Sequence, residues 1–365
     1  MSRDTLLNNI SDWKALFENV TPLVDYASTS QPEVLDILKD NGAHFYFNEK
    51  TYFDQVVDKV NTSNLCVTDF SGNLLDSYLS SLEKSVISSV VVDSKDSLLR
   101  CVKHNSQLSF VVRLSVSGGI SEPGCTKEEM EELFSTVKEM AIPLSALTID
   151  CANKEKVSSC ITQLEAATEL ANNHGISISK IYMTGEGVQQ LVGCSDAVSQ
   201  ASLTQLRTLS QHFTVYLDAS RFFTANIYTI YSLIIGKKVK VVKNQETGAE
   251  KTIILYYTDN GVYCSFYNTH IYEEAIHPIP VSAHGIDYSN APLFESTIFG
   301  PTCDSIDCLG NKFSLPDMEI GEWIKYENNG YKCCNYSARF NGFEDPDIIV
   351  VYLCLFLDIV YILFK

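Results

Sequence analysis

The chain has 365 residues, of which 45% are hydrophobic and 20% charged, a balance typical of a soluble protein with one large or two ordinary domains. Its 27 Lys and Arg residues against 45 Asp and Glu residues give a formal net charge of −18. A protein with this much negative charge repels phosphate backbones and anionic lipids, so the composition argues against nucleic-acid binding. Solubility alone is enough to explain the charge.

The cysteines and histidines give no sign of a metal site. Twelve cysteines are scattered along the chain without any C-x-x-C spacing, and the seven histidines show no metal-ligand spacing. The N-terminus, MSRDTLLNNISDW, lacks the apolar core of a signal peptide. We therefore expect no bound metal, no disulfide framework and a cytoplasmic location.

Helical periodicity alternates with short apolar runs from residue 1 to about residue 225. The expected helices include Leu74–Leu82, Leu98–Val102, Lys127–Met140 and Lys156–His174. The expected strands include Val86–Val92, Leu108–Leu114, Leu144–Ile149 and Lys180–Met183. Strands that alternate with helices of this length predict a parallel sheet covered by helices, either closed or open.

The pattern changes after about Phe222, where short strands are separated by turn signals such as Asp259-Asn260-Gly261. The expected strands are Val239–Lys243, Lys251–Thr258, Val262–Phe266, Glu322–Tyr326 and Ile348–Tyr352. This half is typical of antiparallel β structure. We therefore predict an α/β barrel over residues 1–225 and a C-terminal β-domain over residues 226–365.

The last segment, Ile348–Phe364, is almost wholly apolar and is interrupted by Asp358. A membrane anchor needs about 20 apolar residues, and an aspartate near its centre would cost a few kcal/mol. A buried last strand with a hydrophobic tail is therefore favoured over an anchor. A truncated or misread gene end would give the same pattern.

The string Gly300-Pro301-Thr302-Cys303-Asp304, followed by Asp307, is the most specific in the chain. It resembles the G-P-T-C-D-x-x-D motif of ornithine decarboxylases and of the wider pyridoxal-phosphate-dependent Orn/DAP/Arg decarboxylases. Tyr256–Tyr263 resembles the family's N-D-G-V-Y strand and turn, and Val20-Thr21-Pro22 resembles its V-T-P entry to the lysine strand. Further matches in family order are Gly42, Phe45, Lys50, Thr51, Val112-Arg113-Leu114, Gly185-Glu186-Gly187, Arg221-Phe222-Phe223, Ser314–Met318, Gly321-Glu322-Trp323, Tyr326-Glu327-Asn328 and Phe340–Phe343.

The resemblance spans nearly the whole chain and implies a fold. That fold is an alanine-racemase-like (β/α)₈ TIM barrel followed by an antiparallel β-domain. The family forms head-to-tail homodimers with active sites at the interface, so the resemblance also implies a homodimer or a heterodimer.

The family's cofactor lysine lies in a Y-A-V-K-C-N string, where it holds pyridoxal phosphate as a Schiff base. The corresponding stretch here is Val24–Thr29, which puts Ala27 at the lysine position. The nearest lysines, Lys14 and Lys39, are too distant along the chain to substitute without a register shift. An alanine cannot form an imine, so we expect an inactive protein with no covalently bound cofactor.

Three more family positions are lost. Asp150 stands where a histidine stacks on the pyridine ring, and Asn153 stands where a serine contacts the phosphate. Glu186 interrupts a phosphate loop of three glycines and puts an anion beside a phosphate. The vestigial cofactor-binding residues are Gly185, Gly187, Asp218 and Arg221, where Asp218 replaces the glutamate that pairs with the ring nitrogen.

Cys303 and Asp304 match the family's catalytic pair, which acts in trans across the dimer interface: the cysteine as a proton donor and the aspartate on the substrate's distal amine. Two accounts stay open for their survival here. The loop is kept for fold and dimer packing, or it completes a live site in an active partner subunit.

The resemblance implies an inactive, antizyme-inhibitor-like paralogue that regulates polyamine (putrescine) biosynthesis by protein binding. The family's antizyme face corresponds to about Ser77–His104, a net-basic stretch in an acidic chain. One alternative is a regulatory subunit that heterodimerises with an active ornithine decarboxylase. Another is a residual pyridoxal-phosphate-dependent decarboxylase.

Overall fold

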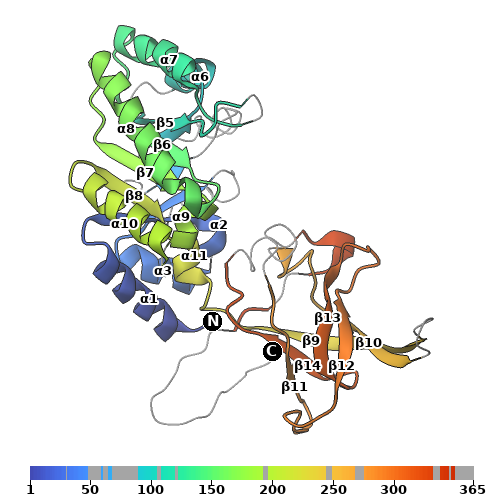
Figure 1. Ribbon diagram of the computed structural model, residues 1–365. Helices are drawn as coiled ribbons and strands as arrows, with labels where there is room; N and C mark the ends of the chain where they lie inside the picture. The colour runs from blue at the N-terminus through green and yellow to red at the C-terminus, as the bar shows by residue number, and fades with distance from the viewer. Residues whose placement is uncertain are drawn as a thin grey trace. The chain divides into compact units, whose positions relative to one another are not determined.

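The computed structural model describes residues 1–29, 31–47, 59–60, 65–67, 89–104, 108–119, 122–191, 196–243, 249–267, 275–331, 338–344 and 347–349. The chain divides into two compact units (Figure 1). Residues 9–222 form a barrel unit, and residues 1–8 with 223–365 form a sheet unit. The first residues join the sheet unit through the Ser2 amide, which donates to the Ile227 carbonyl at 2.7 Å.

The barrel unit is a closed barrel of eight parallel strands, with β1 paired to β8. The strands are β1 Val20–Asp25, β2 His44–Phe47, β3 Leu65–Val67, β4 Ser89–Val92, β5 Phe110–Leu114, β6 Leu144–Asp150, β7 Lys180–Thr184 and β8 Thr214–Asp218. Most strand residues are buried, as expected for strands covered by helices. The fold class predicted for this half is therefore confirmed.

The described helices precede β1 or lie after a barrel strand along the chain (Figure 1). They are α1 Arg3–Leu16, α2 Tyr26–Thr29, α3 Pro32–Asp40, α6 Lys95–His104, α7 Lys127–Glu139, α8 Val157–Asn173, α9 Glu186–Leu191, α10 Ala197–Leu209 and α11 Ser220–Thr224, with the 3₁₀ turn η2 Lys154–Lys156. Capping side chains set where two of these helices begin. Thr126 and Glu129 form a capping box at α7, and the Asp196 side chain caps α10.

The barrel interior is filled by side chains from the strands, as a TIM-type barrel requires. Its cluster of buried residues comprises Leu23, Cys66, Val91, Val111, Ala146, Tyr182 and Tyr216. The Tyr182 and Tyr216 rings stack with centroids 4.4 Å apart. The barrel interior is thus a packed core.

The sheet unit has six strands in the order β11-β14-β9-β10-β12-β13. These are β9 Ile230–Lys243, β10 Glu250–Thr258, β11 Ile279–Val281, β12 Leu293–Phe299, β13 Cys308–Pro316 and β14 Trp323–Tyr326; a 3₁₀ turn, η3, spans Phe340–Gly342. β10 pairs in parallel with β12, whereas the other pairings are antiparallel, so the sheet is mixed. The predicted β-domain is present with this one parallel pairing.

The strand predicted at Val262–Phe266 is wrong. This segment is a series of turns in which the Gly261 carbonyl accepts from the Cys264 and Phe266 amides at 3.1 and 3.2 Å. Phe266 is fully buried and packs edge-on against Tyr326, with ring centroids 4.7 Å apart. The apolar residues of this segment therefore fill the sheet's core without joining a ladder.

Some predictions fall on parts of the chain that the structure does not describe. These are the helix at Leu74–Leu82, the start of the Val86–Val92 strand, residues 77–88 of the expected antizyme face, and the apolar tail after residue 349. Among the described helices, none is both long and apolar enough to cross a bilayer.

Candidate functional site

The expected cofactor positions come together at the end of the barrel where the strands terminate. Asp150 and Asp218 are the last residues of β6 and β8, and Glu186 follows β7 as the first residue of α9. Ala27 lies in α2 directly after β1, and Arg221 lies in α11 directly after β8. TIM barrels build their sites from these strand ends. We call this end the barrel mouth.

Ala27 is buried, with 5% of its surface exposed, and its amide donates to Asp25 Oδ1 at 3.0 Å. The two nearest lysines in sequence are engaged elsewhere. Lys14 Nζ donates to Asn41 Oδ1 at 2.8 Å, and Lys39 pairs with Asp36 at 2.7 Å. Neither lysine therefore takes the position that Ala27 holds.

Asp218 is the centre of a buried hydrogen-bond network and is 1% exposed. Its Oδ1 accepts from the Ser220 amide at 3.0 Å and from the Ser220 hydroxyl at 2.5 Å. Its Oδ2 accepts from Tyr46 Oη at 3.0 Å and from Gln189 Nε2 at 2.8 Å. Ser220 Oγ also accepts from the Asp25 amide at 2.8 Å, which ties the ends of β1 and β8 together. This carboxylate is already surrounded by donors of its own chain.

Burial raises the pKa of Asp218 to about 6, because the charged form is removed from water, and the hydrogen bonds from Ser220 oppose that rise only in part. The folded pKa lies above the unfolded value. The contribution of this group to stability is therefore complete below about pH 4 and is lost as the pH rises through about 6, by roughly 3 kcal/mol.

Asp218→Asn is expected to remove this dependence. The difference in unfolding free energy between wild type and variant should shrink by up to about 3 kcal/mol from pH 4 to pH 7. Urea unfolding of both proteins at several pH values in this range measures it. A constant difference across the range would contradict the assignment.

Glu186 forms an ion pair with Arg221 across the barrel mouth. Arg221 Nη1 and Glu186 Oε1 are 2.8 Å apart, and the side chains are only 28% and 17% exposed. Gln189 supports the pair, because its Oε1 accepts from the Arg221 amide at 3.2 Å while its Nε2 binds Asp218. One connected network thus joins the ends of β7 and β8.

Asp150 faces a second arginine. Arg113 Nη2 and Asp150 Oδ2 are 3.6 Å apart, with the side chains 15% and 45% exposed. Asn153 has a local role, because its side chain caps η2 by accepting from the Lys156 amide at 3.2 Å. Both residues thus have partners within the chain.

Gly185 and Gly187 allow the α9 turn to approach the end of β6. Gly185 has φ +97°, and a Cβ there would collide with the Asp150 side chain and the Cys151 backbone. A Cβ on Gly187 would collide with the Asn153 backbone. The Gly187 amide donates to the Cys151 carbonyl at 2.7 Å. These glycines pack backbone against backbone, and the Gly187 N–H is used inside the fold.

Cys303 and Asp304 lie in the sheet unit, in the loop between β12 and β13. Cys303 is exposed. Asp304 Oδ2 accepts from Tyr263 Oη at 2.7 Å and Oδ1 accepts from the Ile306 amide at 3.0 Å. These bonds hold the pKa of Asp304 below its usual value, the Ile306 amide contributing most. The Asp304 carboxylate is therefore fixed in place.

Asp307 holds this loop together from inside. It is 1% exposed, and its carboxylate accepts from the Val262 amide at 2.9 Å and from the Thr302 amide at 3.0 Å. A Cβ on either Gly261 or Gly300 would collide with the Asp307 carboxylate. The motif is thus a packed unit in which both glycines make room for the aspartate.

Sequence reasoning missed three members of the mouth network: Tyr46, Gln189 and Ser220. The Asp-x-Ser spacing of Asp218 and Ser220 is a local signal, since an aspartate commonly accepts from the backbone two residues on. Tyr46 and Gln189 carry no such signal, because their partner is distant in sequence.

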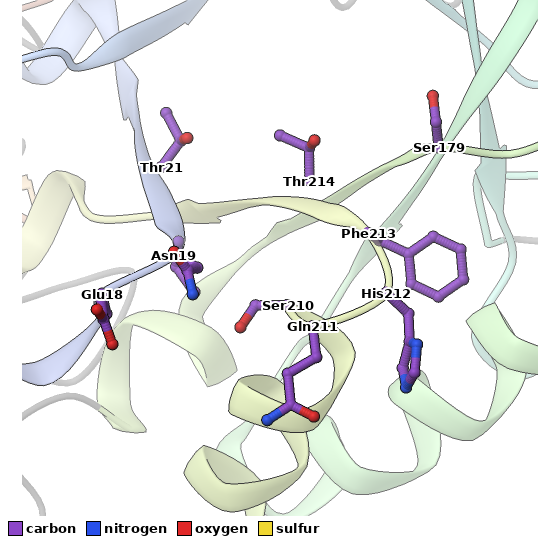
Figure 2. Close-up of a pocket in the computed structure, with 10 residues that line it drawn as sticks. Glu18, Asn19, Thr21, Ser179, Ser210, Gln211, His212, Phe213 and Thr214 are labelled. Carbon is purple, nitrogen blue, oxygen red and sulfur yellow. The ribbon is translucent and has the colours of Figure 1, made fainter.

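The other end of the barrel carries the hollow shown in Figure 2, of about 580 Å³. Residues that precede or begin β1, β7 and β8 line it, among them Asn19, Ser179 and Gln211. The expected cofactor positions lie at the opposite strand ends, in the barrel mouth. Among the described residues no group of three His, Cys, Asp or Glu could hold a metal ion.

Comparison with known proteins identifies the family. Residues 56–330 match the family described as pyridoxal-dependent decarboxylase, C-terminal sheet domain. The chain belongs to the pyridoxal-dependent decarboxylase family. The predicted family is therefore confirmed.

Its relatives in this family include both decarboxylases and antizyme inhibitors. Chloroplastic ornithine decarboxylase from Nicotiana glauca is 22% identical over 365 residues, covering 93% of this chain and 80% of that protein. Antizyme inhibitor 2 from Xenopus laevis is 22% identical over 372 residues, covering 94% and 78%. The chain is thus similar to both kinds of protein at the same level.

Solved structures of the family share the fold. The arginine decarboxylase of Paramecium bursaria Chlorella virus superposes with a TM-score of 0.80 at 18% identity, covering 96% of this chain and 94% of that one. A lysine/ornithine decarboxylase from Vibrio vulnificus, complexed with putrescine, gives 0.77 at 21% identity, covering 96% and 93%. At these identities the likeness shows the fold alone: a barrel followed by a sheet domain.

Proposed function

We propose that this chain is a catalytically inactive member of the decarboxylase family that regulates polyamine biosynthesis by binding another protein, in the manner of an antizyme inhibitor. One observation carries the first half of this proposal. Ala27 lies buried after β1, at the position that the resemblance assigns to the Schiff-base lysine. A methyl group cannot form the imine on which the family's chemistry depends.

The other residues of the mouth do not fit pyridoxal phosphate either. Glu186 pairs with Arg221, so the arginine proposed for the phosphate already faces a carboxylate. At about 6 Å and an effective dielectric of about 20, each unit of phosphate charge would be repelled by Glu186 by roughly 3 kcal/mol. The Gly187 amide is bonded to Cys151, and Asp218 accepts four donors of the chain. These contacts support the absence of the cofactor.

The test of inactivity is chemical. Purified protein is mixed with pyridoxal phosphate, scanned for absorbance, reduced with borohydride and digested for mass analysis. We expect no aldimine absorbance band and no pyridoxyl-lysine. A stoichiometric adduct on any lysine would overturn the proposal.

The partner half of the proposal is supported by the antizyme inhibitors among the relatives and by the surface of α6. Within the described part of the expected antizyme face, Asp96, Arg100 and Lys103 are exposed on α6. The spacing i, i+4 and i+7 places them on one helix face. Two of the three are basic in a chain of net charge −18, which favours an acidic partner surface here.

Capture experiments test this surface. Tagged wild-type chain should retain antizyme, whereas the double variant R100E/K103E should retain at least about tenfold less, as expected when like charges face a partner. The matched control is K238E/K240E, two exposed lysines of β9 in the sheet unit, which should bind as wild type does. Equal loss in both variants, or no capture by wild type, would contradict an antizyme role.

A second candidate is a regulatory subunit of an active ornithine decarboxylase. The ordered Asp304 carboxylate favours it, because Tyr263 and the Ile306 amide hold this group in a fixed orientation on a loop whose Cys303 is exposed. The same capture experiment, repeated with an active ornithine decarboxylase as prey, separates the two candidates. If the tagged chain retains the decarboxylase but not antizyme, the role of regulatory subunit is favoured.

A further inference from the structure

The two acidic residues that depart from the family pattern at the strand ends each face an arginine. Glu186 lies 2.8 Å from Arg221, and Asp150 lies 3.6 Å from Arg113. Both arginine side chains are mostly buried, at 28% and 15% exposed. The members of each pair come from different strand ends, so the barrel closure itself brings them together.

A guanidinium cannot release its proton in a protein, so a mostly buried arginine needs an anion nearby. At Arg221 that anion is Glu186, which is 17% exposed and in direct hydrogen-bond contact. Gln189 orients the Arg221 backbone and belongs to the Asp218 network. Gln189 thus holds the Arg221 backbone in place, and Glu186 balances the charge of the Arg221 guanidinium.

We infer that Glu186 is a built-in counter-ion that occupies an oxyanion site on Arg221, so that the barrel mouth is neutralised by its own chain and needs no phosphate ligand. Removing the Glu186 charge converts this place into a binding site for inorganic phosphate. The inference rests on the Arg221–Glu186 contact and holds whichever protein the chain binds.

The second pair gives a matched control. Asp150 is 45% exposed and lies farther from its arginine, so solvent screens it more strongly. Asp150→Asn therefore removes the same charge from the same end of the barrel with a smaller effect. If only the Glu186 variants respond to phosphate, the effect comes from a specific binding site. If D150N responds equally, it comes from the general loss of negative charge at the barrel mouth.

The experiment is thermal unfolding of the full chain with increasing sodium phosphate, at ionic strength held constant with chloride. Wild type is expected to change by less than about 1 °C. E186Q should unfold about 2–4 °C lower in chloride and recover as phosphate is added. D150N should show a smaller loss and no phosphate response. Titration calorimetry with inorganic phosphate should detect binding to E186Q only.

The double variant E186Q/R221Q tests the pair itself. Both charges are gone, so it should unfold close to wild type and ignore phosphate. If E186Q folds only in phosphate buffer, the inference is supported. Equal phosphate binding by wild type and E186Q, a phosphate response that survives in the double variant, or a double variant less stable than E186Q would overturn it.

Discussion

Asp307→Ala is expected to lower the free energy of unfolding by about 3–5 kcal/mol, the largest effect on stability that we predict for a single side chain. The buried carboxylate accepts from two backbone amides, those of Val262 and Thr302. Each such bond to a charged acceptor contributes about 1.5–3 kcal/mol, and the substitution leaves the buried Val262 N–H without its acceptor. Urea unfolding measures the change.

Asp304→Ala is the control for this prediction, because Asp304 lies three residues away in the same loop but is partly exposed. Its loss should cost much less, since water can replace its bonds to Tyr263 and the Ile306 amide. Asp307→Asn should be intermediate, because it keeps one acceptor oxygen. Similar stabilities for the two alanine variants would show that Asp307 does not hold the loop.

Ala27→Lys is expected to leave carbon dioxide release from ornithine at least on the order of 10³-fold below that of an active relative. Residues that act as one catalytic unit are strongly non-additive, so restoring one member recovers little. Glu186 still neutralises Arg221, and Asp150 still pairs with Arg113. Ala27 is also buried, so a lysine there must displace packed neighbours.

Release of labelled carbon dioxide from carboxyl-labelled ornithine measures this activity. Ala152→Lys, at an exposed position beyond β6, controls for adventitious adducts on a new lysine. Adding E186G and D150H to A27K should raise cofactor binding above that of A27K alone. Substantial turnover by A27K alone would mean that the acidic residues of the mouth obstruct the cofactor little.

Most barrel elements could be predicted, because a buried parallel strand needs a short apolar run whatever surrounds it. The strand predicted at Leu144–Ile149 corresponds to β6 Leu144–Asp150. The helix predicted at Lys127–Met140 corresponds to α7 Lys127–Glu139. Val262–Phe266 has the same β-rich composition but forms turns. Composition predicts burial there, whereas the hydrogen bonds to the Gly261 carbonyl decide the backbone conformation.

The resemblance named the expected site residues one at a time, but it did not indicate which of them would pair. In the sequence, Glu186 and Asp150 are carboxylates at positions where the family has a glycine and a histidine. Their arginine partners lie on other strands, and only the closed barrel brings them within 2.8 and 3.6 Å. Gln189 and Tyr46 could not be found, because a single sequence does not show which distant side chains will share Asp218.

The close packing of Gly261, Gly300 and Asp307 bears on how such chains are recognised. Replacing either glycine by alanine would place a methyl group against the Asp307 carboxylate. Replacing Asp307 would leave the Val262 and Thr302 amides without their acceptor. Mutation is therefore constrained at these positions by the packing of the loop, independently of any selection for turnover. A genome search that scores this string as proof of a working decarboxylase therefore detects a packing requirement of the sheet unit, and not the Schiff-base lysine of the barrel.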